Sequence, residues 1–299
     1  MVTFIDLFAG IGGFHSGLTK AGMKCVGWCE ADKYAQASYR ALYPTDNLWF
    51  SPDVRALNGT EMPYADLWCF GFPCQDVSIA GLKDGMGNTR SGLFYEVTRL
   101  LHETKHKPKW FLIENVKNLL SISNGWGFYG VLSEMDKAGY SIAWRVYNTK
   151  DFGLPQNRER VFIIGHLGND CPSEVLYRPN QSEQSIVRLG NLLKTESFGG
   201  NPQRGRVYSP EGLSPTVTCI KGGGQEPKIL LSKNPNVIRK LTPREFWRLQ
   251  GFTDEQFDTC AKIQSNAQLY KQAGNSVSVP IVYELGKKII EHHRRIYDL

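Results

Sequence analysis

The sequence predicts an α/β fold built around an open, mostly parallel β-sheet, followed by a second, loop-rich region. Short apolar segments typical of buried strands alternate with amphipathic segments of helical length from the N-terminus to Gly165. This alternation is the pattern of repeated βαβ units, which place helices on both faces of a doubly wound sheet. The chain has 299 residues, enough for one large domain and a smaller one at roughly 100 to 200 residues per domain.

The elements of the first half are assigned in order from their apolar patterns. Residues 3–8 form a continuous apolar run typical of a buried strand, and residues 14–21 carry an apolar stripe of helical period. The same two patterns then repeat along the chain. We therefore expect strands over 3–8, 24–30, 65–70, 110–114 and 160–165, and helices over 14–21, 33–42, 94–104 and 128–138.

The second region begins where this pattern dissolves. From about residue 171 to residue 236 the chain is polar and rich in glycine and proline, which predicts a loop-rich second domain. Helical periodicity returns at Thr242, a suitable N-cap, with Pro243 in the first turn. A final helix is expected from Val279 to the C-terminus.

Composition is that of a globular protein without a membrane span. The chain is 41% hydrophobic and 21% charged, and no apolar run approaches the roughly 18 residues that cross a bilayer. The N-terminus leads into the first strand without a secretion signal. The cysteines, 7 in all, form no C-x-x-C pair, as is common in a reducing compartment. We expect a cytoplasmic protein.

The net charge of +6 arises in the second half of the chain. Residues 1–149 carry 14 basic and 14 acidic side chains, whereas residues 150–299 carry 21 basic and 15 acidic side chains. This surplus fits an anionic partner such as a nucleic acid, and it fits a role in solubility equally well.

A glycine-rich corner, Ala9-Gly10-Ile11-Gly12-Gly13, follows the first strand. Glycines there let the backbone approach a bound ligand. Glu30, after the second strand, can accept hydrogen bonds from ribose hydroxyls, and Asp53 can contact an adenine. These residues alone fit a nicotinamide enzyme, a methyl-donor enzyme or a purely structural turn. The missing G-x-G-x-x-G order favours S-adenosylmethionine, because that cofactor has no pyrophosphate.

Reactive side chains follow the later strands. The strand over 65–70 runs into Gly71-Phe72-Pro73-Cys74, which places Cys74 at the carboxyl edge of the sheet, where α/β folds bind ligands. An isolated cysteine is more often a buried structural residue. Here Glu114 and Arg160 are expected to converge on the same crevice, and the glycine-rich residues 75–92 suit a lid. A thiol, a carboxyl group and a guanidinium together can act on a pyrimidine.

The ordered motifs of this chain resemble those of the bacterial DNA (cytosine-5) methyltransferases. The matching segments are 4–13, 71–78, 114–116, 156–160, 239–252 and 272–280. Their order and spacing cover nearly the whole chain, which a chance match does not reproduce. The resemblance implies a Rossmann-like, S-adenosylmethionine-dependent catalytic domain over 1–172 and 271–299. Residues 173–270 would form a small, strand- and loop-rich target-recognition domain and hinge.

The resemblance also implies a reaction, in which a methyl group passes from S-adenosylmethionine to carbon 5 of a flipped-out cytosine in a specific duplex DNA sequence. Cys74 would attack carbon 6 as a thiolate. Glu114, protonated, would donate to the ring nitrogen, and Arg160 would stabilise charge at the ring carbonyl. Arg158 belongs to the same catalytic segment, where it would support the loop rather than touch the base. Loss of the carbon 5 proton and expulsion of Cys74 would release 5-methylcytosine and S-adenosylhomocysteine.

Two further sets of residues come from the same resemblance. The cofactor would be lined by Phe8, Ala9, Gly10, Gly12, Gly13, Glu30, Asp53, Pro73, Leu93 and Asn275. DNA would be contacted by Gln75, Ser78, Gln203, Arg204, Arg206, Thr216 and Thr218, with Lys221 and Lys228 as further candidates. Gln203 falls where a residue would fill the space that the flipped base leaves. No metal is required.

The partners that the resemblance implies are double-stranded DNA and, in the same system, a cognate restriction endonuclease; the chain would act as a monomer in a bacterial or phage-host cytoplasm. Two alternatives stay open. A transfer-RNA cytosine-5 methyltransferase shares the chemistry, although the Cys-Phe-Thr element of that branch is absent. A catalytically silent DNA-binding regulator would keep the fold, although this chain retains every reacting residue.

Overall fold

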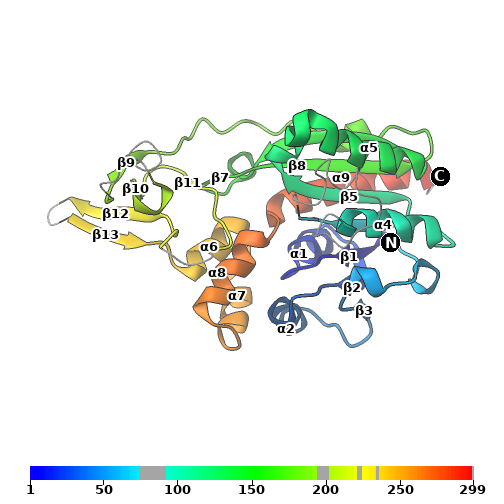
Figure 1. The fold of residues 1–299 in the computed structure, drawn as a ribbon, viewed down its shortest axis with the longest axis horizontal. Helices are drawn as coiled ribbons and strands as arrows, with labels where there is room; N and C mark the ends of the chain where they lie inside the picture. Colours follow the sequence, from blue (N-terminus) through cyan, green and yellow to red (C-terminus); the bar gives the residue numbers. More distant parts are fainter. Residues whose placement is uncertain (74–91, 194–201, 221–223, 234–235, 298–299) are drawn as a thin grey trace.

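The computed structural model describes residues 1–73, 92–193, 202–220, 224–233 and 236–297 (Figure 1). The predictions for Cys74, Gln75, Ser78 and Lys221 lie outside these ranges. In the described part, a seven-stranded sheet with its helices and a four-stranded sheet lie at opposite ends of an elongated molecule. The helices over residues 243–275 lie between the two sheets (Figure 1).

The large sheet confirms the predicted α/β class. Its strand order is β3-β2-β1-β4-β5-β8-β6, and every neighbouring pair is parallel except the two that involve β8. The strands are β1 (Thr3–Leu7), β2 (Lys24–Cys29), β3 (Trp49–Ser51), β4 (Leu67–Phe70), β5 (Trp110–Val116), β6 (Tyr140–Asn148) and β8 (Glu159–Leu167). The strands predicted over 3–8, 24–30, 65–70, 110–114 and 160–165 match five of these to within two residues.

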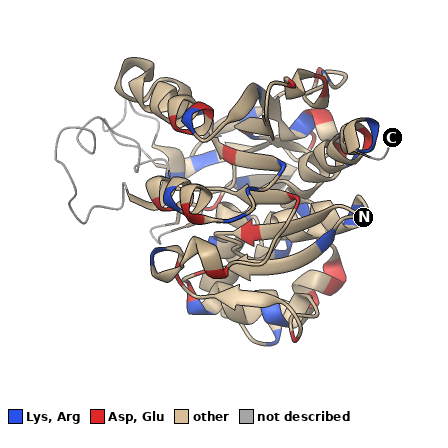
Figure 2. Ribbon diagram, turned by 90° about the vertical axis from the view of Figure 1, so that its right-hand side faces the viewer, with Lys and Arg blue, Asp and Glu red and all other residues tan. Residues whose placement is uncertain are grey.

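Helices cover both faces of this sheet. Successive side chains of a strand point to opposite faces, so both faces of the sheet carry apolar side chains for helices to cover. Trp68 and Phe70 pack with Phe94 of α4, whereas Leu67 and Cys69 share a second core with α1 and α9. The helices are α1 (Gly13–Lys20), α2 (Lys33–Leu42), α4 (Gly92–Glu103), α5 (Trp126–Lys137) and α9 (Val279–Tyr297). Charged side chains of both signs are scattered over the outside of these layers (Figure 2). No described helix is long and apolar enough to span a bilayer.

The second region contains more regular structure than its composition indicated. The small sheet has the order β13-β12-β10-β9, and its strands are β9 (Arg188–Asn191), β10 (Arg206–Tyr208), β12 (Lys228–Lys233) and β13 (Asn236–Lys240). A short parallel pair, β7 (Gln156–Asn157) with β11 (Ser214–Pro215), joins this region to the segment that precedes β8. The strands of the small sheet are short and mix apolar with charged residues, so their apolar signal is weak.

Three helices connect the two sheets: α6 (Pro243–Gln250), α7 (Asp254–Ala261) and α8 (Asn266–Asn275). Thr242 caps α6 in a capping box with Glu245, as its position before Pro243 predicts. Gln256 of α7 donates to Ser16, and Gln272 of α8 accepts from Ser38. These helices therefore pack against α1 and α2 of the large sheet's helical layer.

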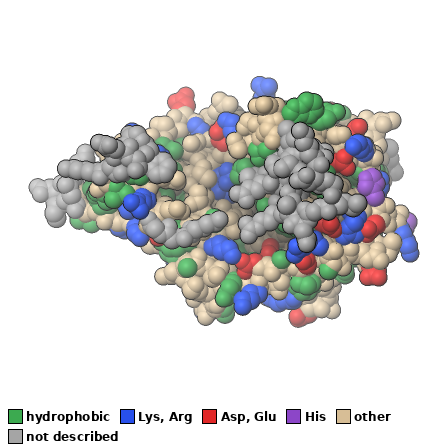
Figure 3. Space-filling view, viewed as in Figure 1, with side chains coloured by type: hydrophobic (Ala, Val, Ile, Leu, Met, Phe, Trp, Pro, Cys, Tyr) green, Lys and Arg blue, Asp and Glu red, His purple; other side chains and the backbone are tan. Residues whose placement is uncertain are grey.

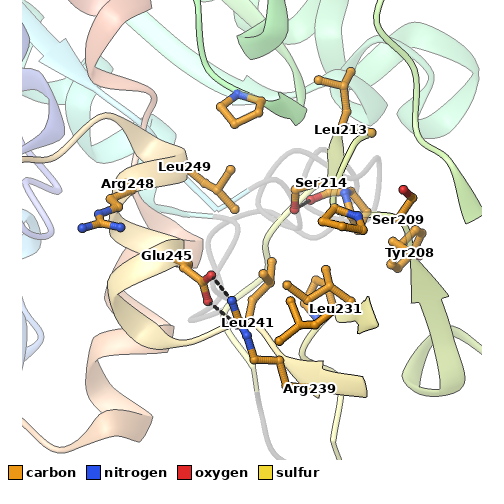
Figure 4. A pocket seen from close by; sticks show the side chains of 16 residues that line it. Tyr208, Ser209, Leu213, Ser214, Leu231, Arg239, Leu241, Glu245, Arg248 and Leu249 are labelled. Carbon is orange, nitrogen blue, oxygen red and sulfur yellow. Dashed lines mark hydrogen bonds and ion pairs between the residues drawn. The ribbon is translucent and has the colours of Figure 1, made fainter. Parts of the chain in front are cut away.

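The ion pair between Arg239 and Glu245 gives this junction a pH dependence (Figure 4). The Arg239 guanidinium lowers the pKa of Glu245 to about 2, below the roughly 4.3 of an unfolded chain. A lowered pKa stabilises the fold above the unfolded value, and this contribution is lost as pH falls toward 2. We expect Glu245→Gln, which keeps the capping acceptor, to lower the free energy of unfolding at pH 7 by about 1 kcal/mol, since both side chains are partly exposed.

Urea unfolding between pH 7 and pH 2.5 checks this expectation, and the difference between variant and wild type should shrink toward the acid end. The exposed Glu211→Gln is the matched control and should leave the unfolding curve unchanged at every pH. A difference for Glu245→Gln that stays constant with pH would contradict the ion-pair explanation.

Candidate active site

The loop that leads to Cys74 is anchored beside Glu114. β4 and β5 are parallel neighbours with Phe70 opposite Ile113, so Gly71 lies next to Glu114. A Cβ atom on Gly71 would lie 3.3 Å from the Glu114 carbonyl oxygen and 3.5 Å from Oε2. The buried Asn115 side chain donates to the Phe72 carbonyl oxygen at 2.8 Å. Glycine at 71 thus leaves room for the glutamate, and Asn115 holds the loop in place.

Arg160 meets Glu114 at the same edge of the sheet. Its Nε lies 3.1 Å from Glu114 Oε1, and both side chains are only 14% exposed. Within the described chain Oε1 has no aligned hydrogen-bond donor. The contact between Arg160 and Glu114 is therefore mainly electrostatic. A carboxyl group held in this way keeps hydrogen-bonding capacity for a further group.

This convergence depends on the direction of β8. β8 is antiparallel to β5, with Val116 opposite Arg160, so the start of β8 meets the end of β5. The structure thus brings Glu114 and Arg160 together as predicted. Pro73 is the last described residue before Cys74. A carboxyl group and a guanidinium at a ligand-binding edge can together polarise a heterocyclic ring.

Arg158 has a different position from Arg160. Its side chain is buried, and its guanidinium donates to the carbonyl oxygens of Val217 (3.1 Å), Gly274 (3.3 Å) and Ser276 (2.8 Å). Burial lowers the pKa of Arg158 to about 9, which leaves it charged at neutral pH. Arg158 therefore joins three segments that are distant in sequence, as expected of a residue that supports the loop.

We expect Arg158→Met to destabilise the fold strongly, because it removes the donors of three carbonyl oxygens while keeping much of the side-chain volume. Each buried acceptor left without a partner costs about 1–3 kcal/mol, so the loss should be about 3 kcal/mol or more. Thermal unfolding measures it. The exposed Arg178→Met is the control and should stay within about 0.5 kcal/mol of wild type. Equal stability of the two variants would contradict the proposed support.

The glycine corner after β1 combines open space with close packing. Gly10 has a φ of 57°, and a Cβ there would meet nothing within 4 Å. Gly12 and Gly13 instead pack against Tyr43 and Val277, where a Cβ would come within 2.3 and 2.6 Å. Only Gly10 therefore leaves room for a ligand, while the other two glycines let helices pack.

Glu30 faces this corner. Its carboxylate accepts from the Gly10 amide at 2.8 Å and from the Asp32 amide at 2.7 Å, and burial raises its pKa. A carboxylate fixed in this way, next to open space over Gly10, fits the hydroxyl groups of a nucleoside. The residues present therefore fit the nucleoside part of S-adenosylmethionine.

The other predicted cofactor residues have mixed surroundings. Asp53 follows β3, caps the next turn and pairs with Arg55 at 2.7 Å. Phe8 has a φ of 55° and packs, with Leu93, at the edge of the core. Pro73 and Asn275 are exposed, and Ala9 is buried against Trp28 and Tyr39.

The predicted DNA-contacting residues lie in the second region. Gln203 and Arg204 are exposed on a single turn, η8 (Gln203–Gly205), and Arg206 is half-buried at the start of β10. The Thr216 hydroxyl donates to the Asn157 carbonyl oxygen at 2.7 Å, whereas Thr218 is exposed. Basic side chains are spread across this face of the molecule instead of forming one patch (Figure 3).

A cavity of about 400 Å³ lies between the small sheet, β11 and α6 (Figure 4). Its wall is mostly apolar and includes Leu213, Ile229 and Leu249. Of its charged residues, Arg239 pairs with Glu245, and Arg248 pairs with Asp254. None of the predicted site residues that the structure describes lines it. The cavity is thus a feature of the junction and lies apart from Glu114 and Arg160.

The comparison with protein families decides the identity. The model of the C-5 cytosine-specific DNA methylase family matches residues 2–198 and 180–291. The chain belongs to this family. It is a DNA cytosine-5 methyltransferase whose methyl donor is S-adenosylmethionine, which confirms the resemblance inferred from the ordered motifs.

Similar curated proteins span almost the same length. The type II methyltransferase M.NgoBI of Neisseria gonorrhoeae is 36% identical over 97% of this chain and 93% of its own length. The type II methyltransferase M.HhaI of Haemophilus parahaemolyticus is 32% identical over 96% of this chain and 94% of its own length.

Solved structures support the fold. The methyltransferase EhMeth of Entamoeba histolytica superposes with a TM-score of 0.73 at 17% identity, covering 98% of both chains. The Dnmt2 methyltransferase of S. pombe also superposes with a TM-score of 0.73, at 18% identity, covering 98% of this chain and 99% of that chain.

Three residues of this site were not singled out from the sequence: Gly71, Asn115 and Gly274. A Cβ on Gly274 would lie 2.2 Å from the Thr218 backbone, so this glycine allows the segment that contains Thr218 to approach α8. Gly71 and Asn115 stood inside motifs that were noted for Cys74 and Glu114. The sequence signal that could have identified Gly71 and Asn115 was their place in the same motifs as Cys74 and Glu114.

Proposed function

We propose that this methyltransferase acts on a flipped-out cytosine in a specific duplex sequence through a covalent bond from Cys74. The observation that carries the proposal is the contact between Glu114 and Arg160, beside the loop that leads to Cys74. A base inside a duplex cannot present carbon 6 to a thiolate, so extrusion of the target is required.

The proposed chemistry divides among three side chains. The Cys74 thiolate forms a bond to carbon 6, and the ring electrons move toward the ring nitrogen, where protonated Glu114 donates a proton. Arg160 stabilises the charge at the ring carbonyl oxygen. S-adenosylmethionine, when bound, supplies the electrophilic methyl group that carbon 5 takes up. A base delivered by solvent then takes the carbon 5 proton, and the electron pair of that bond re-forms the double bond between carbons 5 and 6 and expels the Cys74 thiolate. The ring nitrogen returns its proton to Glu114, which restores the enzyme.

We further propose a division of the chain by task. Residues 1–172 and 271–299 would hold the cofactor, with Phe8, Gly10, Glu30, Asp53, Pro73, Leu93 and Asn275 around it. Residues 173–270 would grip DNA and recognise the target. The small sheet and its exposed residues Gln203 and Arg204 support this division.

The biological setting is proposed from the relatives. Because similar proteins carry the name type II methyltransferase, we propose that the chain works as a monomer in a bacterial cytoplasm, within a restriction-modification system that includes a cognate endonuclease.

A labelling experiment tests the proposal. Wild-type protein is incubated with tritiated cofactor and either mixed-sequence duplex DNA or transfer RNA. Label in 5-methylcytosine of DNA is expected, and bisulfite sequencing of DNA from an expressing host then identifies the target. Label in transfer RNA alone would support the RNA enzyme, and tight DNA binding without cofactor binding would support the silent regulator.

A further inference from the structure

The half-buried Lys228 side chain is directed toward backbone carbonyl groups of two turns. It lies at the start of β12, and its ammonium group donates to the backbone carbonyl oxygens of Arg204, Gly224 (2.9 Å) and Glu226 (3.4 Å). An ammonium group has three N–H donors, so these acceptors engage all of them. Burial lowers the pKa of Lys228, and the neighbouring charge of Lys240 lowers it further. Lys228 therefore has little capacity left for the phosphate contact expected from its sequence position.

The three acceptors belong to two separate turns. The Arg204 carbonyl lies in η8, which carries Gln203, whereas Gly224 and Glu226 lie in the turn that precedes β12. The two turns are about twenty residues apart in sequence, and Lys228 joins them through one charged group. Hydrogen bonds to a charged donor are roughly twice as strong as neutral ones.

Asn191 holds η8 from its other side. Its Nδ2 donates to the Pro202 carbonyl oxygen at 3.0 Å, and a Cβ on Gly205 would lie only 1.8 Å from its Oδ1. The backbone of the turn is thus held between β9 and β12, while the Gln203 side chain is exposed. This arrangement fits a residue that must enter a DNA helix without moving its own backbone.

We propose that Lys228 is a positioning residue that holds the two turns of the recognition region together and thereby controls target discrimination. The inference rests on the proposed role of Gln203 in filling the space of the flipped base. Opening that space costs a few kcal/mol of base stacking, and misplacement of a contacting group by about 1 Å weakens catalysis strongly. If the two turns are held less tightly, the ratio of kcat/KM on the target sequence to that on a mismatched sequence should therefore fall.

The test compares Lys228→Met with Lys262→Met on the protein that bisulfite mapping has characterised. Lys262 is exposed and lies outside both turns, so it is a matched control for the loss of one lysine charge. For Lys228→Met, we expect the ratio of kcat/KM on the target duplex to that on a single-mismatch duplex to fall about tenfold. For Lys262→Met, the ratio should stay within about twofold.

The salt dependence of DNA binding separates positioning from phosphate contact. Loss of one phosphate contact reduces the slope of log affinity against log salt by about one. We expect the slope of Lys228→Met to equal that of wild type. A slope reduced by about one with an unchanged discrimination ratio would overturn the proposal.

Amide hydrogen exchange tests the clamp without any enzymatic activity. In Lys228→Met, exchange should accelerate over 202–206 and over 224–226, and it should stay unchanged within α9. Unchanged exchange in both turns would overturn the inference even if DNA methylation is confirmed, whereas faster exchange in a protein that methylates no DNA would refute the proposed function alone. If Lys228→Met does not fold, Lys228→Gln is measured in the same way.

Discussion

Cys74→Ala should abolish methyl transfer, lowering kcat by at least about 10⁴-fold, because the thiolate that forms the bond to carbon 6 in the proposed reaction is removed. DNA and cofactor affinity should remain near wild type, since the change removes one sulfur atom. Initial rates with tritiated cofactor measure the loss. A duplex that carries 5-fluorocytosine gives a second measurement, because fluorine cannot leave as a proton does and the adduct should accumulate.

The control for this prediction is Cys171→Ala, which removes an exposed cysteine. It should keep wild-type rates and form the same denaturation-resistant complex with the fluorinated duplex. Residual transfer by Cys74→Ala above a few per cent of wild type would rule out Cys74 as the nucleophile.

Glu114→Gln should reduce kcat by about 10²- to 10³-fold while changing DNA affinity little. Glutamine keeps the shape of the side chain beside Gly71 but replaces the carboxyl group that faces Arg160, and with it the group that would donate the proton to the ring nitrogen. Proton transfer by a positioned group is worth about 10²–10⁴-fold. Steady-state kinetics on the mapped target sequence provide the measurement.

Glu159→Gln is the matched control for this second prediction. Glu159 lies near Glu114 in the same sheet, but it is 44% exposed and pairs with Lys117 at 2.9 Å. Its loss should alter kcat by less than about twofold. If both variants lost activity equally, the effect would reflect the local charge balance and not the role of Glu114 at the ring.

The large sheet was predictable because its central strands are uniformly apolar. β4 and β5 are buried on both faces, so their segments stand out from the polar chain around them. β6 was missed because it forms the edge of the sheet and mixes partly buried polar and apolar residues. The resemblance implied strands in the second region, but their positions were not predicted for a related reason, since these strands are short and leave Leu189 and Leu231 exposed.

The reacting residues were predictable from motifs, but the residues that hold them in place were not. The Arg158 guanidinium donates to carbonyl oxygens 59 to 118 residues away, and any residue supplies such a carbonyl. The same holds for Lys228, whose basic character indicated a phosphate contact. The antiparallel direction of β8, which brings Arg160 to Glu114, also depends on tertiary structure.

The last helix has a consequence for biosynthesis. α9 supplies Ile281, Val282 and Leu285 to the core that contains Phe4 and Leu18, so the core beside the first strand is completed only after α9 has been synthesised. Domains generally fold as units during translation, from the N-terminus onward. On the ribosome part of this apolar core therefore stays uncovered until α9 has been synthesised, and messages truncated before codon 279 should yield insoluble, inactive product instead of an unregulated DNA-modifying fragment.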